Sequence, residues 1–173
     1  MIEYLVEQSF IKSIKQYWMP DKSSIYHCDQ GYFLAGKQFS QLIMFMGCAP
    51  KIVLEPSKED IQDANFVAIH LFESFQQGKF YPGKLPFNFR CPSCQQNQEI
   101  NVPEMTCTVC HHQFDSAKQN WRQKAGYSQL FIEVMGIFES EAIPADKLLK
   151  GLENLTGIKW LYFYANESTW KQN

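Results

Sequence analysis

The sequence lacks any apolar run approaching the roughly 20 consecutive residues needed to cross a lipid bilayer. It also lacks a recognisable targeting segment at its N-terminus. Residues 1–20 carry charged side chains among their apolar positions, namely Glu3, Glu7, Lys12 and Lys15. A signal peptide needs an unbroken apolar stretch and a small-residue cleavage site. We therefore expect a cytoplasmic protein that has no membrane partner.

An excess of positive charge is missing as well. The 173 residues include 16 Lys and Arg against 18 Asp and Glu, which gives a formal net charge of −2. Such a chain lacks the broad positive field with which generic DNA-binding proteins attract phosphate groups. No glycine-rich loop that could cradle a phosphate is present either.

A convincing active site is the third absence. His27 directly precedes Cys28, and adjacent side chains usually point apart, so His27 is a poor base for a Cys28 nucleophile. Cys48 and His70 are further candidates, although a buried thiol and a hydrogen-bonded core histidine are the ordinary roles of such residues. The sequence favours a non-enzymatic protein and leaves an enzyme that uses Cys48 or His70 as a third hypothesis.

Apolar side chains, by contrast, are plentiful: 45% of the residues are hydrophobic and 15% are aromatic. This composition can offset the entropy of ordering a chain, so we expect a folded domain. The pattern of apolar residues predicts an α+β fold, a mixed sheet with packed helices that is interrupted by an inserted module. The expected parts are residues 1–78 and 117–173, which form the two halves of the domain, and residues 79–116, which form the module with its linker.

Apolar periodicity and helix-ending residues predict the elements of these parts. Apolar side chains at three- and four-residue spacing from Leu5 to Trp18 predict an amphipathic helix that Pro20 ends. Pro144 begins a second helix, whose apolar stripe is Leu148, Leu149, Leu152 and Leu155 and whose end is Gly157. The other expected elements are a strand at 32–46, a short helix at 58–63 with a Ser57–Asp60 capping box, a strand at 66–72, an exposed connection at 76–86, a helix at 118–125 capped by Asp115 or Ser116, and strands at 127–138 and 158–164.

Two segments of the chain also resemble each other. Phe39-Ser-Gln-Leu leads to Gly47, and Tyr127-Ser-Gln-Leu leads to Gly136. Both segments continue through an expected helix into an aromatic strand. The similarity reflects either two related strand–helix–strand halves or chance, and the sequence leaves both explanations open.

Four of the six cysteines stand in two pairs with the spacing of metal ligands. Cys91-Pro-Ser-Cys94 is followed after twelve residues by Cys107-Thr-Val-Cys110. Two residues between paired cysteines allow both sulfurs to face one ion, and two such knuckles complete a tetrahedral Cys₄ site. The twelve-residue gap suits a short hairpin. Because its interior is mostly polar, we expect the metal to supply most of the energy that folds the module.

This pattern resembles the zinc-ribbon modules, which have paired knuckles with a hairpin between them. The resemblance covers residues 87–114 and implies one structural Zn²⁺ held by Cys91, Cys94, Cys107 and Cys110. Four cysteines would close the coordination shell and leave no position for a substrate. The sequence departs from the pattern at Gln95 and His111, where many such knuckles have a glycine directly after the second cysteine.

Three other interpretations of the cysteines compete with zinc. A reducing cytosol disfavours disulfides. A rubredoxin-type iron site uses the same four ligands, so ligand identity does not separate iron from zinc. Cys107-Thr-Val-Cys110-His111 fits the pattern for attachment of c-type haem, but that interpretation leaves Cys91 and Cys94 without a role.

Basic and aromatic residues surround the cysteines. Residues 79–124 contain six Lys or Arg and three Asp or Glu, and Lys118, Arg122 and Lys124 lie close together in the sequence. These three bases could follow a nucleic-acid backbone while nearby aromatic rings stack on bases. Alternatively, the bases offset the formal −2 charge of a Zn–Cys₄ centre, and the rings form the core of the module. The rings concerned are Phe87, Phe89, Phe114 and Trp121.

The leading functional hypothesis is a non-enzymatic zinc protein that acts as a protein-interaction or regulatory module, through a partner protein or self-association. The aromatic residues of the expected strand 158–164 are of a kind enriched at interfaces, although core packing is the commoner explanation for them. A nucleic-acid-binding accessory protein is the alternative.

Overall fold

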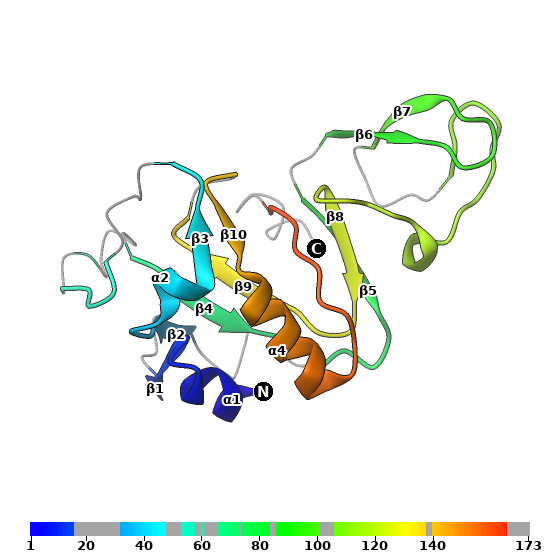
Figure 1. Ribbon diagram of the computed structural model, residues 1–173. Coiled ribbons are helices and arrows are strands. Elements are labelled where there is room, and N and C mark those ends of the chain that lie inside the picture. The colour runs from blue at the N-terminus through cyan, green and yellow to red at the C-terminus, as the bar shows by residue number, and fades with distance from the viewer. Residues whose placement is uncertain are drawn as a thin grey trace, which may run out of the picture. The chain divides into compact units, whose positions relative to one another are not determined.

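The computed structural model describes residues 1–15, 32–47, 53–57, 60, 66–72, 74–83, 86–100, 106–137 and 140–165 (Figure 1). Helices and antiparallel sheets both occur, so the predicted α+β class is confirmed. Every strand pairing among these residues is antiparallel, and the parallel component of the predicted mixed sheet is not seen there.

The chain divides into two compact units. The first unit comprises Met1–Ser74 and Phe131–Leu161, and the second comprises Phe75–Leu130 and Tyr162–Asn173. The second unit contains all four paired cysteines. The expected division at residues 79–116 remains a prediction.

In its described residues, the first unit combines a four-stranded sheet, a two-stranded sheet and three helices. The larger sheet has the strand order β1-β2-β4-β9, and the smaller one pairs β10 with β3. The elements are α1 (Ile2–Glu7), β1 (Ile11–Lys15), β2 (Tyr32–Ala35), α2 (Phe39–Leu42), β3 (Ile43–Phe45), β4 (Ala68–Leu71), β9 (Ile132–Met135), β10 (Ala142–Pro144) and α4 (Asp146–Thr156).

Strand β4 confirms the buried strand that was predicted at residues 66–72. All four of its residues are buried, and it lies between β2 and β9 in the sheet. Continuous apolar sequence is typical of a strand covered on both faces. Its Ile69 belongs to a core that also contains Phe10, Phe33 and Phe39, each no more than 1% exposed.

Helix α4 confirms the second predicted helix. Leu148 and Leu152 are buried in the core, whereas Leu155 is 46% exposed, so the apolar stripe is narrower than the sequence suggested. Gly157 follows the helix with φ of 70°, and its N–H donates to the carbonyl of Glu153. Glycine adopts this left-handed conformation without the steric cost that other residues incur.

The first predicted helix is wrong beyond its first two turns. Helix α1 ends at Glu7, and β1 occupies residues 11–15. Ser9 takes φ of 50°, and the N–H groups of Ser9 and Phe10 donate to the carbonyls of Val6 and Leu5. These paired bonds form a Schellman-type ending, which turns the chain so that Phe10 enters the core. The part of the prediction that covers residues 16–20 lies outside the described residues.

The segment predicted as a strand at 32–46 contains β2, then α2, then β3. Phe39 and Leu42 are the buried residues of α2, and their three-residue spacing fits a helical turn better than a strand. The similar segment Tyr127–Leu130 begins at the end of a strand instead, so the internal repeat is not confirmed. The Ser57–Asp60 capping box is confirmed by bonds in both directions, while the rest of the helix at 58–63 lies outside the described residues.

Four predicted elements of the later chain differ from the structure. The expected exposed connection contains β5 (Lys79–Pro82), which pairs with β8 (Ala125–Ser128). The expected helix at 118–125 is reduced to the short 3₁₀ turn η1 (Ser116–Lys118), and the expected strand at 127–138 is split between β8 and β9. The described residues of 158–164 form no strand.

Candidate metal centre

The second unit carries each cysteine pair on its own hairpin-like turn. Strand β6 (Phe87–Arg90) pairs with β7 (Asn97–Ile100), and the first knuckle is the turn between them (Figure 1). A single bridge between Thr106 and Gln113 closes the second knuckle in the same way. The twelve-residue gap in the sequence predicts one hairpin between the knuckles. The structure instead places the first knuckle inside a hairpin, while residues 101–105 lie outside the described residues.

The two knuckles have the same backbone hydrogen bonds. In the first, the N–H of Gln95 donates to the carbonyl of Cys91 over 3.0 Å, and the N–H of Cys91 donates to the carbonyl of Gln96 over 2.9 Å. In the second, the corresponding bonds from His111 to Cys107 and from Cys107 to His112 are both 2.9 Å long. This matching geometry presents the two cysteines of each pair on the inner side of a tight turn.

The residues after each second cysteine adopt the conformation that glycine usually provides. Gln95 has φ of 63° and His111 has φ of 56°. Non-glycine residues rarely occupy this left-handed region because their Cβ atom approaches the backbone. The sequence therefore departs from the common knuckle pattern while the backbone keeps its shape.

The four sulfur atoms converge on one point. The Sγ atoms of Cys91 and Cys110 are 3.8 Å apart, those of Cys94 and Cys107 are 3.7 Å apart, and all four lie within 4.8 Å of one another. Four sulfurs placed tetrahedrally at about 2.3 Å from a zinc ion would be about 3.8 Å apart. A disulfide, in contrast, requires a separation of about 2.05 Å. The cluster has the dimensions of a metal site, and it could hold a metal ion.

Burial and hydrogen bonding differ among the four cysteines. Cys91 and Cys107 are fully buried, Cys94 is partly exposed and Cys110 is exposed. The N–H groups of Val109 and Cys110 point at the Sγ atom of Cys107 over 3.4 and 3.5 Å. The second knuckle thus directs positive ends of peptide dipoles at one sulfur.

These surroundings shift two pKa values in opposite directions. The backbone N–H groups of Cys110 and Val109 lower the pKa of Cys107 to about 6, because they stabilise its thiolate. The N–H of Gln96 lowers the pKa of Cys94, but desolvation and the three neighbouring sulfurs outweigh it and raise that pKa to about 12. Without a cation, repulsion between four close thiolates opposes the loss of all four protons. A divalent cation removes that repulsion, so metal uptake by such a cluster releases protons.

Gln98 connects the two knuckles, and the sequence analysis missed it. Its side chain is 9% exposed, and its Oε1 atom accepts a hydrogen bond of 2.9 Å from the backbone N–H of Thr108. The Thr108 hydroxyl lies 3.4 Å from the same oxygen. A buried amide that meets the opposite turn fixes the knuckles relative to each other. The polar sequence around Gln98 gave no signal that this one glutamine would be buried.

An aromatic cluster supports the knuckles, and it contains Phe89, Phe114 and Trp121 of the four predicted rings, whereas the side chain of Phe87 lies outside the described part of the chain. Phe114, Trp121 and Ala125 are buried, and Phe80 and Phe89 pack against them. The ring of Phe89 lies 5.0 Å from that of Phe114 and 4.8 Å from that of Trp121. Rings buried in this way do not offer their faces to bases.

The three bases of the nucleic-acid hypothesis have different local contacts. Lys118 lies 3.5 Å from the carboxylate of Asp115 and is 81% exposed, and Lys124 donates to the carbonyl of Asn88 over 2.9 Å. Arg122 has an exposed side chain and lies on a turn with φ of 55°. Their assignment to nucleic-acid binding remains a prediction.

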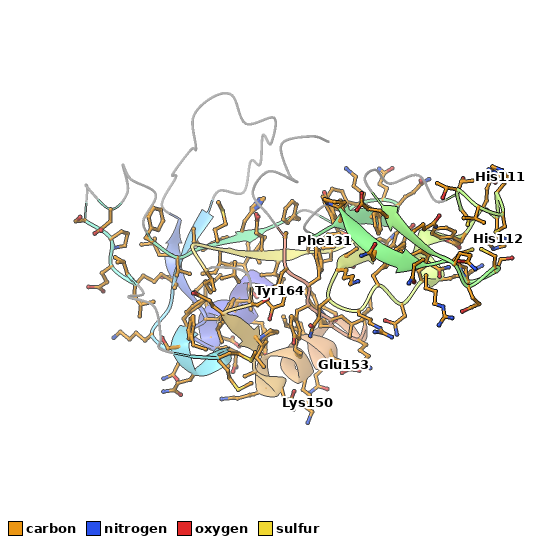
Figure 2. The ribbon with its side chains drawn as sticks, turned by 90° about the horizontal axis from the view of Figure 1, so that it is seen from above. His111, His112, Phe131, Lys150, Glu153 and Tyr164 are labelled. Carbon is orange, nitrogen blue, oxygen red and sulfur yellow. The ribbon has the colours of Figure 1, made fainter. Side chains whose placement is uncertain are left out.

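His70 belongs to the first unit, whereas the cysteine cluster belongs to the second. His70 is buried in β4, where its Nδ1 atom is 3.4 Å from Glu133 on β9 and its ring packs on Phe72. Cys28 and Cys48 lie outside the described residues. His111 and His112 are exposed at the outer end of the second unit (Figure 2).

A comparison of the whole chain with protein-family models, curated proteins and solved structures finds no match. Among the described residues, no helix combines the length and the apolar character that crossing a membrane would require.

Proposed function

We propose that this is a non-enzymatic, cytoplasmic zinc protein in which Cys91, Cys94, Cys107 and Cys110 hold one structural Zn²⁺, and in which the second unit acts as a protein-interaction or regulatory module. The observation that carries the zinc part is the convergence of four sulfurs at separations of 3.7 and 3.8 Å. No other group of His, Cys, Asp and Glu among the described residues gathers in this way.

A structural role for the metal follows from the ligand set. Four thiolates fill a tetrahedral shell, whereas a catalytic zinc keeps one position for water or substrate. Four thiolates also place a formal charge of −2 on the centre, which makes the metal a weak Lewis acid. The role we assign to the ion is to join two turns that belong to different parts of the chain.

The metal content of purified, reduced protein tests this proposal. We expect one zinc per chain, and we expect the Cys94→Ser variant to lose it. Cys28→Ser is the matched control, because it removes a cysteine that is not one of the four paired ones and should leave the zinc in place. A Cys94→Ser variant that retains one zinc per chain would contradict the ligand assignment.

Spectroscopy distinguishes zinc from iron at the same four ligands. Zinc has a filled d shell and leaves the protein colourless, whereas an iron–thiolate centre absorbs visible light. Replacing the metal with Co²⁺ should give intense visible bands typical of tetrahedral thiolate coordination. A reddish protein that contains stoichiometric iron would replace zinc with iron in this proposal and would reopen an electron-transfer role.

The interaction role is supported by an exposed apolar side chain at the knuckles. Val109 is the residue before Cys110 and is 60% exposed, on a turn that the metal would make rigid. We expect Val109→Asp to abolish a partner interaction or self-association measured in solution, while the zinc content is unchanged. Leu161→Asp, at another exposed apolar residue, is the control. Binding that both variants retain, or the absence of any partner, would count against this role.

A further inference from the structure

We propose that Cys110 is a modification site: its thiolate is the first of the four ligands to react with a peroxide, and that reaction releases the metal. This inference rests on the proposed zinc centre and adds a chemical reactivity to it. It does not require either unit to be an enzyme.

The exposure of its sulfur to oxidants favours Cys110 as the first ligand to react. Cys91 and Cys107 have no exposed surface and Cys94 is partly exposed, whereas Cys110 is exposed. Oxidants reach cysteine sulfurs according to their exposure and their thiolate character. Coordination to zinc keeps all four sulfurs deprotonated, so exposure becomes the property that separates them.

Hydrogen bonding to the cysteine sulfurs also favours Cys110. Cys107 accepts two backbone N–H groups, from Val109 and from Cys110 itself. These donors draw electron density from the Cys107 sulfur and reduce its nucleophilicity. Among the described residues, no backbone N–H group donates to the Sγ atom of Cys110, whose neighbours are the other three sulfurs, with that of Cys91 at 3.8 Å. Cys110 therefore combines the greatest exposure with an electron density that no such donor reduces.

A second thiolate, that of Cys91, lies close enough to Cys110 to complete the reaction. In the first step, the Cys110 thiolate attacks one oxygen of the peroxide, the O–O bond breaks and hydroxide leaves. The sulfur is oxidised to a sulfenic acid as the peroxide is reduced. In the second step, the Cys91 thiolate, 3.8 Å away, attacks the sulfenic sulfur. An S–S bond forms, the S–O bond breaks and a second hydroxide leaves.

The product of these steps cannot hold zinc as the starting cluster does. The two thiolates have given two electrons to the peroxide, and their sulfurs are joined in a disulfide. Cys94 and Cys107 remain as the only two thiolates of the cluster, so half of the tetrahedral shell is lost. The ion would be released, and a single disulfide between Cys91 and Cys110 would join the two knuckles in place of four bonds to the metal.

The experiment uses the full-length zinc-loaded protein in a Cys28→Ser, Cys48→Ser background, so that every remaining cysteine belongs to the cluster. The protein is treated with less than one equivalent of hydrogen peroxide. Mass spectrometry then locates the oxidised cysteines, and a colorimetric chelator measures the released zinc. We expect Cys110 to be oxidised several-fold faster than Cys94 and zinc to appear in step with the Cys91–Cys110 disulfide.

Other outcomes overturn the inference in distinguishable ways. Equal oxidation of all four cysteines, or oxidation of Cys94 first, would refute the assignment of Cys110. Oxidation of Cys110 without zinc release would refute the coupling. His111→Ala is the control for a neighbouring imidazole: loss of the Cys110 preference in that variant would show that exposure is not its cause. A protein without stoichiometric zinc before treatment would instead refute the proposed function.

Discussion

The two units of this protein differ in what holds them together. The first unit buries a continuous apolar core of aliphatic and aromatic side chains between its sheets and helices, with Leu5, Ala35, Phe39 and Ile69 fully buried. The second unit, as far as its residues are described, buries one small apolar cluster around Trp121. It carries its four paired cysteines on short turns instead.

This difference teaches where a metal is needed. A buried phenylalanine or leucine contributes about 1.5–3 kcal/mol through the loss of apolar surface from water, so the core of the first unit can offset much of its chain entropy. The second unit has three buried residues in its cluster, and its strands are four residues long. A structural zinc supplies about 10–16 kcal/mol of apparent binding free energy, which becomes folding free energy when binding and folding are coupled.

Removing the metal is the change with the largest expected effect. A strong chelator at neutral pH should abolish hydrogen-exchange protection of β6, β7 and the second knuckle, and leave β4 and α4 protected. The reason is that about 10–16 kcal/mol of metal binding would be lost from one unit only. Exchange measured peptide by peptide with mass spectrometry checks this result. Equal loss of protection in both units would show that they fold as one cooperative structure, and no loss in either would show that the second unit needs no metal.

Phe39→Ala should produce the opposite pattern at a smaller cost. Phe39 is fully buried, and its ring stacks on that of Phe10 at 5.3 Å, so truncation should cost about 3–5 kcal/mol of unfolding free energy in the first unit. The zinc content should not change. Denaturant unfolding and metal analysis measure the two quantities.

Met46→Ala is the matched control for this variant, because Met46 lies in the same unit and is 66% exposed. Its cost should be within about 0.5 kcal/mol. If Phe39→Ala reduced zinc affinity as strongly as it reduced the stability of the first unit, the two units would be energetically coupled and the contrast between them would fail.

The features that were predictable from the sequence depend on local signals. The paired cysteines, the Ser57–Asp60 box and the helix that follows Pro144 are each encoded within a few residues, and the structure contains the cysteine cluster, the box and α4. Continuous apolar sequence likewise predicted β4, because a strand that is buried on both faces carries apolar residues at nearly every position.

The features that were missed depend on distant partners or on a single backbone angle. Strand β5 lies in a segment rich in Gly, Pro, Lys and Gln, and it is a strand because Lys79–Pro82 pairs with Ala125–Ser128. Apolar periodicity continued through residues 5–18, but the left-handed conformation of Ser9 ends α1 within that run. Gln98 is buried because the second knuckle meets it, which no pattern of neighbouring residues reveals.

Gln98→Met would measure how much this link between the knuckles matters to the second unit. The substitution keeps the length of the side chain and removes the acceptor of the Thr108 N–H, and the loss of one such hydrogen bond costs about 0.5–1.5 kcal/mol. Zinc affinity should fall by about two- to twelvefold, since 1.4 kcal/mol corresponds to a factor of about ten. Competition with a chromophoric chelator measures the affinity. Gln113→Met, the same change at an exposed position near the second knuckle, should leave the affinity unaltered.

The last expected effect is a gain in zinc affinity, and it distinguishes two neighbouring histidines. His111 has φ of 56°, a conformation that is strained for residues with a Cβ atom, so His111→Gly should raise zinc affinity by about 1 kcal/mol, or roughly fivefold. His112 is exposed but has no positive φ, and His112→Gly should instead cost about 0.5–1 kcal/mol because glycine loses more conformational entropy on folding. Opposite signs measured by the same competition assay would show that backbone strain, rather than the loss of an imidazole, sets the effect. A gain in neither variant would mean that the knuckle backbone relaxes around the metal, and that the second unit is less rigid than its hydrogen bonds imply.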